Sequence, residues 1–117
     1  MTVDLDLCYT PAAVIARRIR DGELSPVRVV ENALRRIAEV DPHLNAFCFV
    51  YPDEAMDRAR EAERQVAAGR PLGPLHGVPV AIKDMTPTRG KRTTLGSRVY
   101  EHWVPDRDAL VVERLAA

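Results

Sequence analysis

The chain lacks several features that would place it in a particular class of protein. Its 17 basic residues are balanced by 17 acidic ones, so the formal net charge is zero. That balance gives no electrostatic reason to expect nucleic acid or an anionic membrane as a partner. No apolar run approaches the ~20 residues of a membrane span. The N-terminal residues include acids where a signal peptide carries basic residues. We therefore expect a soluble, cytoplasmic protein.

Cysteine is also scarce, because Cys8 and Cys48 are the only two and lie far apart in the sequence. No CxxC pair or Cys/His cluster indicates a metal site, and free thiols are expected in a reducing compartment. The glycines form neither the GxGxxG nor the GxxxxGK pattern of a phosphate-binding loop. We expect neither a metal nor a cofactor.

What the chain does have is an ordinary globular composition. Hydrophobic residues make up 46% of the 117 residues and charged residues 29%. These values argue against disorder, and the length suits one modest domain.

Helix signals dominate the first part of the chain. Thr10 and Pro11 predict the start of one helix, which Gly22 ends. Ser25 predicts the N-cap of a second helix, which the Asp41-Pro42 pair should stop. A third helix is expected from about Pro52 to Gly69, with a face of small residues that could lie close to a sheet: Ala55, Ala59, Ala62 and Val66.

Two short apolar runs predict strands, at residues 46–50 and 78–82. Pro79 is tolerable near the start of the second strand, and Lys83 follows at its C-terminal end. A last helix is expected to start near Asp106 or Asp108. Its pattern is still running at Ala117, so we expect that the chain is a piece of a longer domain.

Lys83 is the main candidate for chemistry. At the ordinary lysine pKa of about 10.4, only about one lysine in 10³ is neutral at pH 7. A lysine at the end of a buried strand can be desolvated, and a desolvated amine can accept a proton from a hydroxyl nucleophile. The alternative from position alone is a lysine whose ammonium reaches water from the end of a strand.

The residues around Lys83 resemble the amidase signature family. The resemblance is carried by Gly73-Pro-Leu-His-Gly-Val-Pro-Val-Ala-Ile-Lys-Asp84, Thr93-Thr-Leu-Gly-Ser97 and Pro105-Asp-Arg-Asp-Ala-Leu-Val-Val112. It implies an α/β class, with this chain as the N-terminal portion of an α/β/α sandwich around a mixed sheet that is incomplete here. The expected parts are a helical region at 10–70, the catalytic-lysine strand and loop at 71–105, and a truncated helix at 106–117.

The resemblance also implies a mechanism. The family cleaves amides with a Ser-Ser-Lys triad, in which one serine is acylated, a second relays the proton and the lysine is the base. Lys83 matches that lysine. Asp84, Thr93 and Thr94 are candidate supporting residues, although ordinary turn and loop roles are as compatible with their positions.

The serines do not match the family pattern. Only Ser25 and Ser97 are present, and Ser97 does not lie where the family keeps either catalytic serine. The family's Gly/Ser-rich segment is absent, and with it the oxyanion hole. Ser25 is expected to serve as a helix cap. The chain would therefore supply one member of a three-residue triad and is expected to be inactive alone.

Three functional hypotheses stay open. The first is a fragment of an amidase that acts on a small-molecule carboxamide. The second is the A subunit of a glutamyl-tRNA(Gln)-type amidotransferase, the only case in which tRNA is a partner. The third is an inactive product or an interaction module. An uncovered sheet edge and helix face would favour self-association of the isolated chain.

Overall fold

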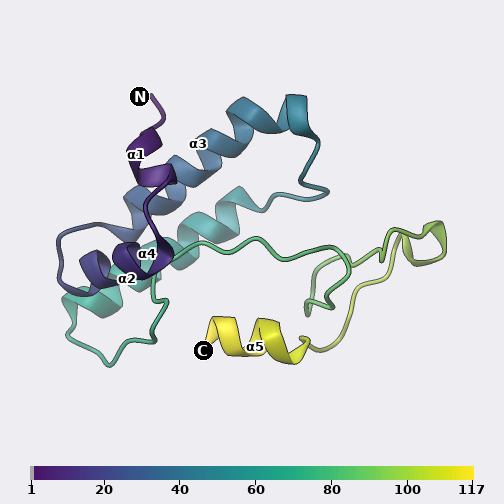
Figure 1. The fold of residues 1–117 in the computed structure, drawn as a ribbon. Helices are drawn as coiled ribbons and strands as arrows, with labels where there is room; N and C mark the ends of the chain where they lie inside the picture. The colour runs from purple at the N-terminus through teal and green to yellow at the C-terminus, as the bar shows by residue number, and fades with distance from the viewer. Residues whose placement is uncertain (1) are drawn as a thin grey trace. The chain divides into compact units, whose positions relative to one another are not determined.

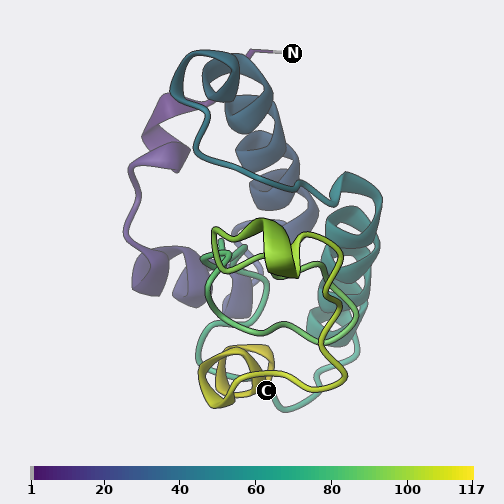
Figure 2. The same ribbon diagram turned by 90° about the vertical axis from the view of Figure 1, so that its right-hand side faces the viewer.

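The computed structural model describes residues 2–117 and divides the chain into two compact units, one up to Pro79 and one from Val80 onward. The first unit contains four helices among its described residues: α1 (Leu5–Cys8), α2 (Ala12–Arg20), α3 (Pro26–Leu44) and α4 (Pro52–Ala67) (Figure 1). The second unit contains the 3₁₀ helix η1 (Arg98–Tyr100) and helix α5 (Leu110–Ala116), joined by long loops (Figure 2).

The caps of the helices follow the sequence in part. Ser25 caps α3 as predicted, because its hydroxyl oxygen accepts a hydrogen bond from the Arg28 N–H at 3.3 Å. The prediction for α2 is wrong by one residue, because Pro11 occupies the N-cap position. Thr10 instead follows the end of α1, and its hydroxyl donates to the carbonyl oxygen of Asp6 in that helix at 2.7 Å.

The predicted stop at Asp41-Pro42 is also wrong, since α3 continues through Pro42 to Leu44. Pro42 removes the hydrogen bond that its N–H would give to the Ala38 carbonyl oxygen and its ring crowds that carbonyl, yet the helix continues for two more residues. The helix ends at Asn45, which takes the left-handed conformation with φ 51°. The Asp41 carboxylate then accepts hydrogen bonds from the N–H groups of Ala46 and Phe47, at 2.7 and 3.1 Å.

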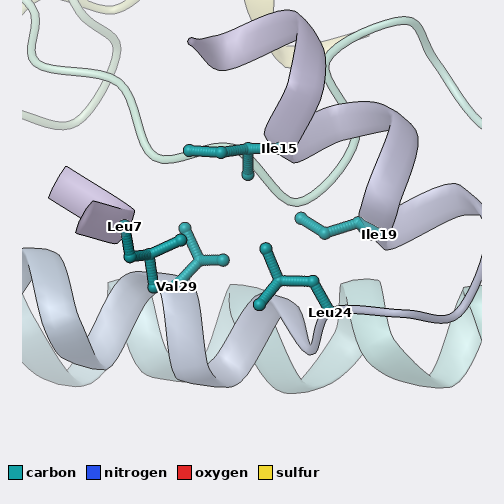
Figure 3. Close-up of a cluster of buried hydrophobic side chains, with 5 residues drawn as sticks. All are labelled: Leu7, Ile15, Ile19, Leu24 and Val29. Carbon is teal, nitrogen blue, oxygen red and sulfur yellow. The ribbon is translucent and has the colours of Figure 1, made fainter. Parts of the chain in front are cut away.

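The core of the first unit is a cluster of five buried side chains that point toward one another (Figure 3). They come from α1, α2, the turn after α2, and α3: Leu7, Ile15, Ile19, Leu24 and Val29. Val66 of α4 and Val78 of the following loop pack against this cluster. The small-residue face of α4 is partly confirmed, because Ala59 is buried, but α4 packs along α3 rather than on a sheet (Figure 1).

Neither predicted strand forms, and residues 2–117 contain helices and loops only. A strand requires a neighbour that continues its hydrogen-bond ladder. In the segment 46–50 the first two N–H groups already bind Asp41. In the segment 78–82, Pro79 has no N–H to donate, and Val80 and Ile82 are exposed. The mixed sheet of the expected sandwich is therefore not formed by these residues.

No helix in the described part of the chain combines the length and the apolar character that crossing a bilayer requires.

Candidate active site

Lys83 lies in the second unit, just before a turn at Asp84 and Met85. Its carbonyl oxygen accepts a hydrogen bond from the Thr86 N–H at 2.9 Å, which closes the turn. The expectation of a buried strand end is wrong here, because Ala81, Ile82 and Lys83 are all exposed. Burial of this segment requires covering residues, and the described part of the chain places none over it.

Asp84 is held by two residues that lie ten and eleven positions later. Its carboxylate accepts hydrogen bonds from the Thr94 N–H, at 2.9 Å, and from the Thr94 hydroxyl. Its carbonyl oxygen accepts the Leu95 N–H at 3.0 Å. The Thr94 hydroxyl and N–H hold the pKa of the Asp84 carboxyl below its ordinary value, and Arg92 lowers it further, against a small opposing effect of burial.

Thr93 belongs to a different set of contacts, although it is the neighbour of Thr94. Its side chain is almost fully buried, with 2% of its surface exposed. Its N–H donates to the carbonyl oxygen of Trp103 at 3.0 Å, and its hydroxyl lies 3.4 Å from the Lys91 carbonyl oxygen. Thr93 therefore ties the loop around Lys91 to the segment near Trp103.

The comparison with protein families decides the classification. Residues 28–117 match the family model described as Amidase, which covers well over half of the chain.

The chain belongs to the amidase signature family.

Curated relatives agree with this membership. The chain is 45% identical over 112 residues to the A subunit of the glutamyl-tRNA(Gln) amidotransferase of Salinispora tropica, which covers 96% of the chain and 23% of the relative. It is 44% identical over 110 residues to the subunit of the same name from Acidothermus cellulolyticus, over 94% of the chain and 22% of the relative. This amidase signature chain thus spans less than a quarter of the length of these relatives.

Solved structures agree as well. One neighbour comes from a vestigial protein complex described in connection with the origins of an s-triazine catabolic enzyme, with a TM-score of 0.84 and 31% identity over 91% of this chain and 23% of that one. A second is a bacterial aryl acylamidase of the amidase signature family, with a TM-score of 0.74 and 35% identity over 80% of this chain and 20% of that one. The chain therefore takes the backbone arrangement of a corresponding part of amidase signature enzymes, an α/β family.

Both serines of this amidase signature chain have structural partners. Ser25 caps α3 and also donates to the Glu63 carboxylate of α4 at 2.5 Å. Ser97 caps η1, because its hydroxyl oxygen accepts the Val99 N–H at 3.2 Å. The chain therefore supplies the primary amine of Lys83, whereas its two serine hydroxyls each cap a helix.

Other polar and aromatic side chains also have structural contacts. The ring of His76 lies 2.9 Å from the Ala62 carbonyl oxygen of α4. Tyr100 and Trp103 form an aromatic pair, with ring centroids 5.7 Å apart. No group of three or more His, Cys, Asp or Glu side chains that could hold a metal ion occurs within residues 2–117.

The contacts that position the residues before α5 have no counterpart in the sequence predictions. Asp108 was expected near the start of that helix, which instead begins at Leu110. The Asp108 carboxylate accepts the Arg89 N–H at 2.6 Å, and the Ala109 N–H donates to the Pro87 carbonyl oxygen at 2.8 Å. No local sequence pattern predicts these hydrogen bonds, because they join residues about twenty positions apart.

Proposed function

We propose that the protein to which this chain contributes hydrolyses the C–N bond of a small linear carboxamide through an acyl-serine intermediate, with Lys83 as the proton acceptor. The observation that carries the proposal is Lys83 in its stretch from Gly73 to Asp84, within a chain that belongs to the amidase signature family. The same proposal includes a cytoplasmic location and a small-molecule amide as the substrate.

The chemistry assigns one role to Lys83. As one serine hydroxyl attacks the amide carbonyl, its proton passes to the second, relaying serine, whose own proton is taken by the Lys83 amine, which is neutral when substrate is bound. The proton then passes to the leaving nitrogen, and water hydrolyses the acyl-serine. Asp84, Thr93 and Thr94 support the loop that carries Lys83.

The chain alone is expected to be inactive. Ser25 and Ser97 are the only serines, and each accepts a hydrogen bond at the start of a helix. We expect the 117-residue chain to release no ammonia from a carboxamide above the buffer rate. Measurable release that disappears in Lys83→Ala would contradict this expectation.

A second candidate is the A subunit of an amidotransferase, which is favoured by the names of the relatives from Salinispora tropica and Acidothermus cellulolyticus. In that case the protein would work with partner subunits, and the ammonia would be transferred to misacylated tRNA.

The two candidates are separated by the fate of the ammonia. A chimera in which this chain replaces the matching 112 residues of the Salinispora tropica relative is assayed with glutamine, partner subunits and misacylated tRNA. Amidated tRNA supports the amidotransferase, whereas free ammonia from simple carboxamides without partners supports the amidase. In both cases the activity is expected to require Lys83.

A further inference from the structure

The backbone that follows Lys83 forms a loop, residues 84–95, whose two ends are hydrogen-bonded together. Three bonds join them: the Thr94 N–H and the Thr94 hydroxyl each donate to one carboxylate oxygen of Asp84, and the Leu95 N–H donates to the Asp84 carbonyl oxygen. The residue directly after Lys83 is therefore fixed through its side chain and its main chain at once.

These bonds also limit which other groups the Asp84 carboxylate can bind. Hydrogen bonds to an ionised acceptor are stronger than neutral ones, and here both carboxylate oxygens accept from Thr94. Among residues 2–117, the Lys83 ammonium forms no ion pair, with Asp84 or with any other acid. The Asp84 carboxylate stays ionised, but Thr94 holds it in a position where it forms no ion pair with the Lys83 amine, and a closer carboxylate would favour the protonated form of that amine.

Thr93 provides a contrast within the same loop. Its contacts run to Thr88, Lys91 and Trp103, and the Gly90 N–H donates to the Pro105 carbonyl oxygen at 3.0 Å. The Lys91 part of the loop is therefore held by a second set of bonds that does not include Asp84 or Thr94.

We propose that Asp84 and Thr94 are a positioning pair for Lys83, which fixes the backbone after it and keeps the Asp84 carboxylate away from its amine, whereas Thr93 holds the opposite part of the loop. The proposal rests on the proposed function in one respect, namely that Lys83 is the proton acceptor. Asp84 and Thr94 act through Lys83 and are not catalytic residues themselves.

The test uses the full chain, in which Lys83 and Lys91 are the only lysines. Competitive acylation of the amines over a range of pH, read by mass spectrometry, gives a separate pH profile for each lysine, with the N-terminal amine as the internal reference. Thr94→Val removes the hydroxyl at nearly constant volume and Thr94→Ser keeps it. Thr93→Val is the matched control at the neighbouring position.

We expect Thr94→Val to shift the Lys83 profile to higher pH, because it frees one of the two Asp84 carboxylate oxygens, and a carboxylate oxygen that can approach the amine favours the ammonium form. Thr94→Ser should restore the wild-type profile, and Thr93→Val should leave Lys83 unchanged. In the double variant Asp84→Asn/Thr94→Val the upward shift should disappear, since the released group is then neutral. Each variant is first checked for an unchanged circular dichroism spectrum.

An unchanged Lys83 profile in Thr94→Val would overturn the proposal. So would an equal shift in Thr93→Val, or an upward shift that persists in the double variant. Acylation reports on the amine whether or not an amide is hydrolysed, so failure here is distinguishable from failure of the proposed function, which Lys83→Ala tests in an active chimera.

Discussion

Gly77 lies where the loop after Leu75 passes close to α2 and α3. Its φ is +79°, and a Cβ atom there would lie 3.0 Å from Ile19 Cδ1 and 3.1 Å from Pro26 Cβ. We expect Gly77→Ala to lower the free energy of unfolding by about 2–4 kcal/mol, from the left-handed backbone together with overpacking. Urea denaturation measures this change.

Gly69 supplies the matched control. Its φ of +65° is similar, but a Cβ atom there would meet nothing within 4 Å. Gly69→Ala should therefore cost only the conformational part, about 1 kcal/mol. Equal losses at the two positions would show that the close approach to Ile19 and Pro26 contributes nothing.

The Asp84 carboxyl gives a pH prediction at the same scale. The Thr94 hydrogen bonds lower its pKa in the folded chain. Its stabilising contribution is then complete above the ordinary aspartate pKa of about 3.9 and is lost as the pH falls through the lower, folded-state pKa. The Thr94 amide resonance should follow this acid titration, and Asp84→Asn should abolish it. A Thr94 resonance that titrates equally in Asp84→Asn would contradict the assignment.

Single residues also show how far the sequence could predict the candidate site. Lys83 could be identified from its neighbours along the chain, because the Gly73–Asp84 stretch is contiguous. The pairing of Asp84 with Thr94 could not, because a turn aspartate looks the same whether it binds water or a threonine ten residues later. The different contacts of Thr93 and Thr94 likewise depend on loop geometry rather than on residue type.

At the level of the secondary-structure elements, the N-cap of α3 carries a prediction. Ser25 accepts the Arg28 N–H and donates to Glu63 of α4. We expect Ser25→Ala to lower the free energy of unfolding by about 1 kcal/mol or slightly more, measured in urea. Ser97→Ala, which uncaps the three-residue η1, is the control and should have a smaller effect. The same loss in both variants would refute the importance of the α3 cap.

The helices could be predicted because the residues that start and end a helix are local in the sequence. The strands could not, because a strand depends on pairing with another segment. Proline and serine mark the start of α3, and Pro52 with two following acids marks the start of α4. An apolar run such as 78–82 becomes a strand only when another segment pairs with it, and no segment of the described chain does so. Pro42 failed as a stop signal because a proline disfavours the helical turn before it but does not forbid it, and α3 continues to Leu44.

At the scale of the whole molecule, exposed apolar side chains predict self-association. Val80 is 48% exposed and Met85 58%, and Leu110 on α5 is 66% exposed. Apolar surface of this kind favours association between copies. Sedimentation velocity should show an average mass that rises with concentration, and Val80→Lys or Leu110→Lys should reduce the rise. A single monomeric species at all concentrations would contradict this expectation.

The role of Lys83 is tested most directly by amide hydrolysis in the chimera with the Salinispora tropica relative, whose remaining sequence we expect to supply the serines that the family uses. General-base catalysis contributes about 10²–10⁴-fold to a rate, so Lys83→Ala should lower kcat/KM for a carboxamide by at least about 10²-fold. Lys91→Ala should leave it nearly unchanged. Hydrolysis that survives Lys83→Ala at the rate of the Lys91→Ala control would contradict the account.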